Sequence, residues 1–322
     1  MNVGIIGAGN IAHKMADTIN AMPETELHAV ASRNLDRANE FARRHHARKA
    51  YGTYEDLVRD VDVELVYIAT PHSHHFAHAK LCLENGKNVL CEKAFTANAA
   101  QAKELVAIAR NRDLFLGEAM WTRFLPMRRT LDELLSAETI GTTVGLTANL
   151  CYPLEGKARL VDPNLAGGAL LDVGVYPINF ALMTFGKDIE KIETSCSVYS
   201  SGVDATDHIR FVYRDGRFAE LYASMLAISD ASGIVLGSEG YIVFKNVNNC
   251  EGIEIRDRER KIVREIAAPR QITGFEYELG SAVRAIRAGK KECDEMPLSE
   301  SVFVMELLDR IRGDWKLKFP FE

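Results

Sequence analysis

A charged pair ends an apolar run in the first third of the chain. Glu92 and Lys93 follow residues 87–91, KNVLC, which have the pattern of a short buried strand. A lysine ammonium at the end of such a strand can bind a substrate oxygen and stabilise negative charge that develops on it. The alternative is that both charges simply return to solvent at the end of the strand.

A second group of residues that could take part in catalysis lies in residues 167–176, GGALLDVGVY. Paired glycines lead there into an apolar helix that carries one acid, Asp172, and one phenol, Tyr176. Residues four apart share a helix face, so both side chains can serve one site. A free tyrosine, with a pKa of about 10, is a poor base at neutral pH, but a nearby ammonium lowers that pKa toward the working range. The alternative roles are an acid that favours the helix dipole and a half-buried core tyrosine.

The elements that must position these groups begin with a glycine turn between a strand and a helix near the N-terminus. The residues expected to bind a cofactor there are Gly7, Gly9, Asn10, Ile11 and Ala12. The first glycine permits a tight turn, the second lets backbone amides approach a diphosphate, and the alanine lets the helix pack on the strand. The helix N-terminus favours anions, so the pattern predicts a dinucleotide site. The alternative is a glycine-rich turn without a ligand.

Ser32 and Arg33 stand at the end of the second expected strand, where a carboxylate would bind the ribose 2′-hydroxyl of NAD. No acid follows until Asp36, which fits the start of a helix better. Ser32 can donate a hydrogen bond, and Arg33 can clamp a 2′-phosphate or stack on adenine. The predicted cofactor is therefore NADP, with NAD as the alternative dinucleotide. For Arg33 the simpler role is a solvated loop charge.

A histidine-rich loop follows the expected strand at residues 63–70. The residues expected to cap a helix and contact the cofactor there are Thr70, Pro71, His72 and His75, and Glu92 and Lys93 lie one strand over. His74 and His78 share a helix face, but no carboxylate or cysteine nearby completes a metal site. We therefore expect no metal, and the alternative for these histidines is an exposed surface.

Strand and helix signals alternate over residues 1–120. Short apolar strands separated by longer helices predict a doubly wound parallel sheet, which is a Rossmann domain. Longer alternating segments fill residues 121–322, and Asp215-Gly216 between two of them is a hairpin signal. We expect there a substrate-binding α+β domain on a large, mainly antiparallel sheet, with its last helix packed back on the first domain. Residues 151–170 are expected to form an irregular loop.

Composition limits the classes of function. A length of 322 residues suggests about two domains, and a net charge of -6 provides no positive field for nucleic acid or anionic membrane. No apolar run approaches the roughly 18 residues of a membrane span, and the N-terminus lacks a signal-peptide pattern. We therefore expect a cytoplasmic protein that acts on a small molecule, with no nucleic-acid or membrane partner.

These motifs together resemble the Gfo/Idh/MocA family, named for glucose–fructose oxidoreductase and inositol dehydrogenase. The glycine turn, the Thr70-Pro71 loop with His75, the Glu92-Lys93 pair and residues 167–176 occur in the family's order and cover nearly the whole chain. Within the family, residues 118–126, EAMWTRFLP, look like the dimeric dihydrodiol dehydrogenase and D-xylose 1-dehydrogenase branch. Tyr176 is similar to that branch as well, because most relatives carry histidine there.

The resemblance implies an NAD(P)-dependent dehydrogenase that oxidises a secondary carbinol of a sugar or cyclic trans-diol. It makes Tyr176 the general base in oxidation, while Lys93 tunes it and binds the substrate oxygen. Asp172 orients the substrate or the lysine. Two departures are Ala94, which replaces the usual proline after the lysine, and His72, which replaces a common asparagine.

The substrate wall is expected at the start of the second domain. The candidate residues are Trp121, Arg123, Phe124, Arg159 and Tyr176. An aromatic face suits sugar rings or arene diols, whereas the alternative for Trp121 is core packing at the domain junction. Relatives imply a homodimer through the sheet of the second domain. Two other classes of protein stay open: a redox-inert dinucleotide sensor of the same fold, which needs neither Lys93 nor Tyr176, and a metal-dependent enzyme that uses the histidine loop.

Overall fold

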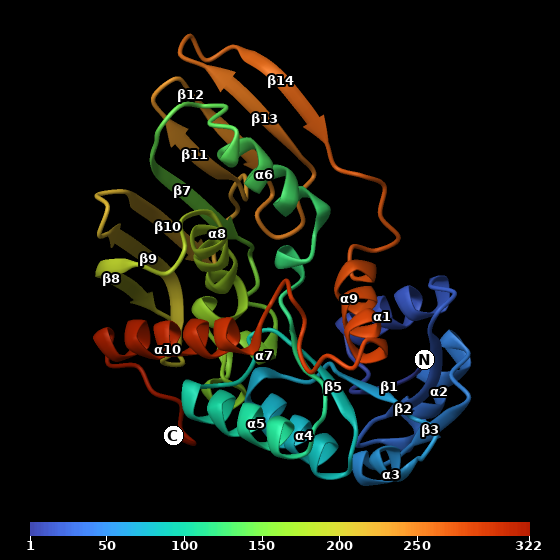
Figure 1. Ribbon diagram of the computed structural model, residues 1–322. Helices are drawn as coiled ribbons and strands as arrows, with labels where there is room; N and C mark the ends of the chain where they lie inside the picture. The colour runs from blue at the N-terminus through green and yellow to red at the C-terminus, as the bar shows by residue number, and fades with distance from the viewer. The chain divides into compact units, whose positions relative to one another are not determined.

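The protein divides into two compact units, seen here in a computed structural model that describes residues 1–322 (Figure 1). The first unit comprises Met1–Trp121 and Gln271–Leu307, and the second comprises Thr122–Arg270 and Leu308–Glu322. Each unit is built around one sheet. The assignment of cofactor binding to residues 1–120 and of substrate binding to residues 121–322 stays a prediction.

The first unit is built from alternating strands and helices. Its elements are β1 (Asn2–Ile6), α1 (Asn10–Ala21), β2 (Glu26–Ala31), α2 (Leu35–His45), β3 (Lys49–Tyr51), α3 (Tyr54–Arg59), β4 (Leu65–Ile68), α4 (His72–Glu84), β5 (Asn88–Glu92), α5 (Ala99–Asn111), β6 (Leu116–Ala119) and α9 (Glu276–Arg287). All six strands are parallel, in the order β3-β2-β1-β4-β5-β6. The predicted doubly wound Rossmann sheet is confirmed. The strand order reverses between β1 and β4, and ligands of such sheets bind at this switch point.

Helix starts differ between the switch point and the rest of this sheet. The side chains of Asn34, Thr53 and Asn98 accept hydrogen bonds from backbone amides at the starts of α2, α3 and α5. Helices α1 and α4, which follow the two central strands, have Gly9 and Pro71 at their N-cap positions and no such bond. The backbone amides at the starts of these two helices are therefore not occupied by a capping side chain.

The second unit contains an eight-stranded sheet with helices on it. Its elements are α6 (Pro126–Ser136), β7 (Thr143–Cys151), α7 (Ala158–Val161), η2 (Pro163–Leu165), η3 (Leu170–Gly174), α8 (Val175–Phe185), β8 (Ile189–Val198), β9 (Asp204–Tyr213), β10 (Phe218–Ser224), β11 (Gly233–Gly237), β12 (Gly240–Lys245), β13 (Gly252–Asp257) and β14 (Ile262–Ala267). The order is β14-β13-β12-β11-β7-β10-β9-β8, and only β7 and β10 pair in parallel. The predicted mainly antiparallel sheet and the hairpin at Asp215-Gly216 are confirmed. Two further helices, η1 (Trp121–Arg123) and α10 (Leu298–Asp314), have residues in both units.

One face of the second sheet carries the helices. Helix α8 packs on β7 and β10, η3 packs on β7, β9 and β10, and α6 packs on β13 (Figure 1). Alternation along β9 follows this arrangement, because Ile209 and Phe211 are buried while His208 and Arg210 are exposed. The functional segment η3–α8 therefore lies on the covered face.

One expectation about residues 151–185 is wrong. Residues 151–170 are not an irregular loop, because they hold α7 and the 3-10 turn η2, which starts where the side chain of Asp162 accepts the amide of Asn164. The helical run Pro163–Phe185 is also long and apolar enough to cross a membrane by length and composition alone. Because 94% of its apolar window is buried inside the protein, this run has the surroundings of a core helix.

Candidate active site

The glycine turn between β1 and α1 has one packed side and one open side. Gly7 has a φ of +106°, and a Cβ there would lie 2.7 Å from the carbonyl oxygen of Ala69, so only glycine fits. A Cβ on Gly9 would meet no atom within 4 Å. Helix α1 begins without an acid in its first turn, while Ala12 is fully buried beneath it. The turn and the helix start thus form a cradle that fits the diphosphate of a dinucleotide.

A pair of arginines stands at the end of β2. Arg33 is exposed, and Ser32 is buried with its hydroxyl accepting the amide of Asn34 at 3.4 Å. Arg37, from the first turns of α2, donates through Nη2 to the carbonyl oxygen of Ala8 at 3.4 Å. Sequence analysis missed Arg37, although it lies four residues after Arg33. No carboxylate stands between the strand and the helix, since Asp36 lies in the first turn of α2 as expected.

The two arginines lie near the ring of Tyr54, the first residue of α3. Burial raises the pKa of the Tyr54 phenol, while the charges of Arg33 and Arg37 oppose that shift, so all three groups lie close together. The Tyr54 ring meets His78 edge to face at 4.5 Å between centroids. Arginines and aromatic rings together suit a purine that carries a phosphate nearby.

His75 ties two strand ends together. Its Nδ1 lies 2.8 Å from the carbonyl oxygen of Ala94 and its Nε2 lies 2.8 Å from that of Thr70. Burial lowers the pKa of His75 to about 4, against the effect of these two carbonyls. A neutral imidazole has one N–H and donates to only one of them. The structure therefore gives His75 a positioning role, whereas direct contact of this ring with a cofactor stays a prediction.

The rest of the histidine loop surrounds this tie. Thr70 shares a hydrogen bond with Nδ1 of His78 at 3.0 Å, and Pro71 forms the start of α4. His72 is buried and meets the ring of His75 edge to face at 5.6 Å. Burial and the neighbouring histidines lower the pKa of His78 to about 4. The low pKa values of His75 and His78 keep these two rings neutral at neutral pH.

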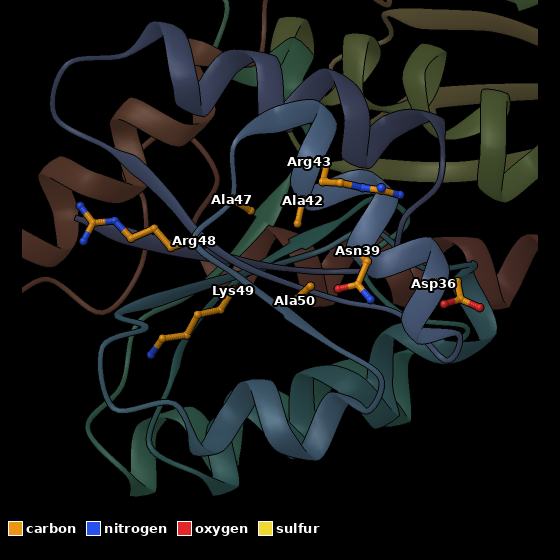
Figure 2. Close-up of a pocket in the computed structure, with 8 residues that line it drawn as sticks. All are labelled: Asp36, Asn39, Ala42, Arg43, Ala47, Arg48, Lys49 and Ala50. Atoms are coloured by element: carbon orange, nitrogen blue, oxygen red, sulfur yellow. The ribbon is translucent and has the colours of Figure 1, made fainter.

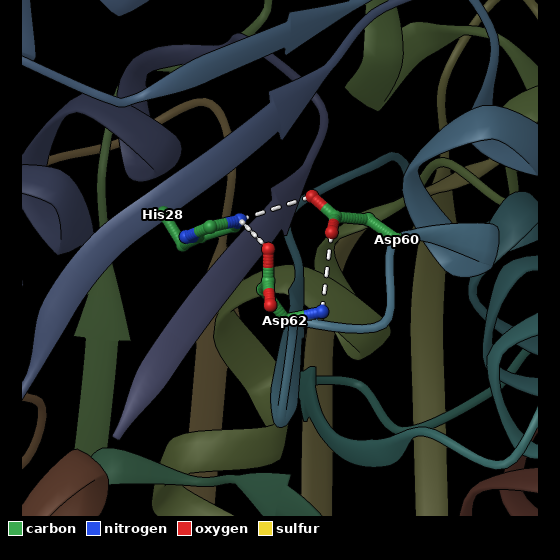
Figure 3. Close-up of side chains that lie close together, drawn as sticks. All are labelled: His28, Asp60 and Asp62. Carbon is green, nitrogen blue, oxygen red and sulfur yellow. Dashed lines mark hydrogen bonds and ion pairs between the residues drawn. The ribbon is translucent and has the colours of Figure 1, made fainter.

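A cluster with metal-ligand chemistry lies at the opposite edge of the sheet, where β4 begins. His28, Asp60 and Asp62 point toward one another (Figure 3). The Lys49 ammonium lies 3.0 and 3.1 Å from the two oxygens of Asp60 and 3.2 Å from Asp62, and the Tyr51 hydroxyl donates to Asp60. Burial alone would raise the pKa of Asp60, but these hydrogen bonds lower it to about 2. The cluster is therefore an ion-pair network in which the Lys49 ammonium already contacts the carboxylates of Asp60 and Asp62.

A shallow hollow of about 580 Å³ lies on the outer side of α2 and β3. It is lined by Asp36, Asn39, Ala42, Arg43, Ala47, Arg48, Lys49 and Ala50 (Figure 2). Arg48 pairs with Glu26 and Lys49 with Asp60, while the side chains of Arg43 and Arg48 point in different directions (Figure 2). Because its charges are paired or diverge, this hollow lacks the convergent polar groups of a ligand site.

Glu92 and Lys93 occupy the end of β5 with different surroundings. Glu92 is buried and accepts hydrogen bonds from the Tyr67 hydroxyl and, at 3.2 Å, from the backbone amide of Lys93. Lys93 is half-buried. The Lys93–Ala94 peptide bond is cis although residue 94 is not proline. The buried carboxylate thus fixes the backbone from which the lysine extends.

A second buried carboxyl group faces Glu92. Glu278, in α9, is fully buried, and neither of its carboxyl oxygens has a hydrogen-bond partner. Burial raises its pKa well above the ordinary value, and the charges of Glu92 and Glu276 add to that shift. Burial and the nearby carboxylates therefore favour the protonated form of Glu278. Sequence analysis missed it, because nothing in its local sequence distinguishes a buried acid from the exposed ones nearby.

Trp121 packs on its first-unit neighbours with one face. Its ring stacks on Phe275 with centroids 4.4 Å apart and an angle of 11° between planes. A Cβ on Gly274 would lie 3.0 Å from the indole. Core packing, the alternative given above, thus accounts for one face of this half-buried ring, and a role in substrate binding stays a prediction.

Two of the predicted site residues meet in the second unit. Arg159, in α7, donates from Nη1 to Oδ1 of Asp172 at 2.8 Å and from Nη2 to Oδ2 at 3.3 Å. The Asp172 side chain is 7% exposed and that of Arg159 is 41% exposed. The pairing places a guanidinium between the catalytic candidate and solvent.

The segment that carries Asp172 and Tyr176 differs from the expected uninterrupted α-helix. Residues Leu170–Gly174 form a π-helical turn, and the α-helix begins at Val175. A π turn is bonded from each residue to the fifth one along, so it is wider than a turn of an ordinary α-helix. The helical segment is present, but its first turn is not α-helical, and a shared face for Asp172 and Tyr176 stays a prediction. Such turns occur frequently at functional sites.

Tyr176 sits in the first turn of α8, and Arg123 braces that turn. Arg123 is buried and donates through Nε to Oδ1 of Asn179 at 2.6 Å, and Asn179 in turn donates to the carbonyl oxygen of Val175 at 2.8 Å. Phe124 is buried beside Arg123 in the chain. Arg123 therefore supports the turn that carries Tyr176, whereas contact of Arg123 and Phe124 with substrate stays a prediction. Joint action of Tyr176 with Lys93 stays a prediction as well.

Comparison with known proteins identifies relatives along the whole chain. An oxidoreductase family with an NAD-binding Rossmann fold (GFO/IDH/MocA) matches residues 1–119, and the GFO/IDH/MocA C-terminal domain matches residues 128–243. The chain is 36% identical over 325 residues to the trans-1,2-dihydrobenzene-1,2-diol dehydrogenase of Homo sapiens, covering 98% of this chain and 97% of that one.

Solved structures share the fold. A 3-ketoreductase from Actinomadura kijaniata, in complex with NADP and TDP-benzene, matches with a TM-score of 0.87 and 27% identity, covering 97% of both chains. A levoglucosan dehydrogenase in complex with NADH and levoglucosan matches with a TM-score of 0.86 and 19% identity, over 97% of this chain and 96% of that one. At the latter identity the likeness shows the fold alone.

Proposed function

Because the chain belongs to the Gfo/Idh/MocA oxidoreductase family, we propose that it is a dehydrogenase that oxidises a secondary hydroxyl of a cyclic trans-diol or sugar with NADP. The observation that carries the proposal is a single ammonium, Lys93, held at the end of β5 by the bond from its amide to Glu92. This strand end neighbours the switch point of a sheet whose glycine turn fits a diphosphate.

A bound nicotinamide supplies the acceptor for the substrate hydride in oxidation and the donor in reduction. Tyr176 takes the proton of the reacting hydroxyl in oxidation and returns it in reduction. The ammonium of Lys93 binds the same oxygen and stabilises the negative charge that develops on it. Asp172, held by Arg159, orients the substrate through its remaining lone pairs.

The preference for NADP rests on charge at the end of β2. Arg33 and Arg37 bring two guanidiniums to this place, and Ser32 adds a hydroxyl, whereas no carboxylate stands there to bind a 2′-hydroxyl. Arginine pairs with phosphate through two parallel hydrogen bonds. The cradle for the diphosphate comprises Gly7, Gly9, Asn10, Ile11 and Ala12, and the residues proposed for the nicotinamide end are Thr70, Pro71, His72, His75, Glu92 and Lys93.

The substrate class follows from the relatives and from the proposed wall. The human relative, 36% identical, is a dehydrogenase of a trans-dihydrodiol of benzene. Trp121, half-buried, offers an aromatic face to a flat ring, and the half-exposed guanidinium of Arg159 offers donors to hydroxyl groups. A cyclic trans-diol satisfies both features, and a pyranose ring does so with more hydroxyls.

We further propose a cytoplasmic homodimer that forms through the open face of the second sheet. That face carries Ile234 on β11, Val243 on β12 and Tyr222 on β10, all at least partly exposed. Ion pairs from Arg210 to Glu193 and Glu220 flank them on β8–β10. Apolar side chains with a charged rim are typical of protein interfaces. Light scattering after size exclusion tests the dimer, and Tyr222→Asp is expected to yield the monomer.

The decisive experiment measures turnover and cofactor binding separately. Trans-dihydrobenzenediol and D-xylose are offered with NADP and with NAD, and reduction is followed at the nicotinamide absorbance band. Lys93→Met and Tyr176→Phe are expected to lower kcat by about 10²- to 10⁴-fold. Binding of NADPH, followed by its fluorescence, is expected to stay within about threefold. Unchanged turnover in both variants contradicts the mechanism, and tight NADPH binding by a wild-type protein without turnover on any diol or sugar indicates a sensor instead.

A further inference from the structure

The segment that carries Asp172 and Tyr176 begins on a buried carboxylate of β9. The amide of Leu170, the first residue of η3, donates to Oδ2 of Asp204 at 2.6 Å. The amide of Ala169 also bonds to this carboxylate, which is 2% exposed. Amides at the start of a helix have no partner within the helix, and an acid that accepts them fixes where the helix begins. Asp204, in β9 and 34 residues after Leu170 in the chain, therefore sets the start of the π turn.

The paired glycines of the motif leave room for this contact. Gly168 has a φ of +118°, and a Cβ there would lie 2.2 Å from Oδ1 of Asp204. A Cβ on Gly167 would lie 2.5 Å from the carbonyl oxygen of Leu160, which accepts the amide of Gly168 at 2.9 Å. Because Leu160 follows Arg159 in α7, the glycine pair joins three parts: the carboxylate, the π turn and the helix that carries the arginine.

A fixed cation lies near Asp204. Arg312, in α10, is 4% exposed, and its charge acts on the Asp204 carboxylate. It is held by two bonds of 2.9 Å to Glu322 and one of 2.8 Å to Asp309. Its guanidinium also stacks over the Phe319 ring, 4.3 Å from the centroid. Asp204, Arg312 and Phe319 line one small void, so the three groups are neighbours.

A second acid on β9 provides a comparison. Asp207 is fully buried and lies near η3, because a Cβ on Gly174 would be 3.5 Å from its Oδ2. Burial raises the pKa of both acids, and for Asp207 the shift is larger because the charge of Asp204 adds to it. Burial and the charge of Asp204 thus favour the protonated form of Asp207, while Asp204 is the member that accepts backbone amides.

We propose that Asp204 is a positioning residue for catalysis. Its carboxylate, near the charge of Arg312, binds the amides at the start of the π turn and so holds Asp172 and Tyr176 in their reacting geometry. The inference rests on the proposed function, since it gives Tyr176 the proton transfer. A displacement of about 1 Å in a reacting group can cost about a hundredfold in rate, so a contact outside the site can have a large effect.

The test compares Asp204→Asn with Asp207→Asn. Asparagine keeps the size of the side chain and one acceptor but loses the charge. Asp204→Asn is expected to lower kcat by about 10- to 100-fold while the dissociation constant of NADPH stays within about twofold, since the glycine cradle belongs to the first unit. Asp207→Asn, a change at an equally buried position of the same strand, is expected to keep kcat within about twofold, because no amide of the π turn bonds to the Asp207 carboxyl group.

Three outcomes overturn the inference. They are a wild-type kcat in Asp204→Asn, an equal loss of kcat in Asp207→Asn, and a loss of NADPH binding in parallel with kcat. If Asp204→Asn does not fold, Arg312→Lys decides, because it keeps the charge and removes the planar fork. That variant is expected to lose about threefold or more in kcat at unchanged NADPH affinity, and an unchanged kcat overturns the inference. Tyr176→Phe is measured in the same series: full activity there removes the proton transfer proposed for Tyr176, whereas a wild-type protein without turnover removes the proposed function itself.

Discussion

Arg159 holds Asp172 through two hydrogen bonds, of 2.8 and 3.3 Å, so that the plane of the carboxylate is fixed as well as its position. The pair joins α7 to η3 and neutralises a buried negative charge four residues before Tyr176 in the chain. A substrate hydroxyl that reaches Asp172 therefore meets an acceptor that is already oriented. This arrangement gives Arg159 a role through Asp172 in addition to any contact it makes with substrate.

We expect Arg159→Lys to lower kcat/KM by about tenfold, because a lysine cannot hold the carboxylate at two points. Arg159→Met is expected to lower it further. Steady-state kinetics of these variants, of Asp172→Asn and of the double variant Arg159→Met with Asp172→Asn form a cycle. The two effects are expected to be coupled by about 1 kcal/mol or more. Additive effects would show that the arginine acts independently of Asp172.

Cofactor choice is expected to change at two arginines. Arg33→Ala and Arg37→Ala each remove a cation from the end of β2, and we expect the dissociation constant of NADPH to rise by about tenfold or more. The dissociation constant of NADH is expected to change by less than about twofold, because NADH has no 2′-phosphate. Fluorescence titration with both nucleotides measures this. Arg43→Ala on the same helix is the matched control, and a similar loss in that variant would contradict the assignment.

Stability at alkaline pH is expected to rise in Glu278→Gln. Glu278 is buried as a neutral acid, and its folded pKa lies well above the value of 4.5 in the unfolded chain. The unfolded state therefore loses this proton first, and the free energy of unfolding falls by about 1.4 kcal/mol per pH unit between 4.5 and the folded pKa. A glutamine removes that loss. Urea unfolding at about pH 5 and pH 8 should show a stabilisation that grows with pH.

Glu276→Gln is the matched control for that measurement, since it lies in the same turn of α9. Its carboxylate accepts the amides of Ile272, Thr273 and Gly274. Removing the charge from this cap is expected to destabilise the protein by about 1 kcal/mol. A Glu278→Gln variant that is less stable than wild type at pH 8 would mean that Glu278 is ionised in the folded protein.

Acid stability is expected to depend on Asp60. Its pKa is about 2 in the folded protein and 3.8 ordinarily, so its contribution is complete above pH 3.8 and is lost as the pH falls through 2. Asp60→Asn is expected to cost about 2 kcal/mol at neutral pH and almost nothing near pH 2. Unfolding curves at several pH values test this. Asp62→Asn, whose side chain is 56% exposed, is the control and is expected to have a small effect at every pH.

Local sequence was enough to predict the frame of the first unit. Short apolar strands between longer helices require a covered parallel sheet, and glycines between a strand and a helix require a turn that side chains do not block. Gly7, with its positive φ, and Gly9, which faces open space, conform to that prediction. The prediction was incomplete even there, because β3 is only three residues long and so has no clear apolar period.

What the sequence by itself determined is therefore the residue types: an ammonium after a strand, a phenol and an acid on one helical segment, and cations in place of an acid after β2. Only the tertiary structure decided their partners, because Asp204, Glu278 and Arg312 act on residues far from them in the chain. A buried acid has the same letter as an exposed one, and its chemistry is set by the solvent that packing removes. Likewise, the spacing of Asp172 and Tyr176 was visible in the sequence, whereas the π turn between them depends on a carboxylate from another strand.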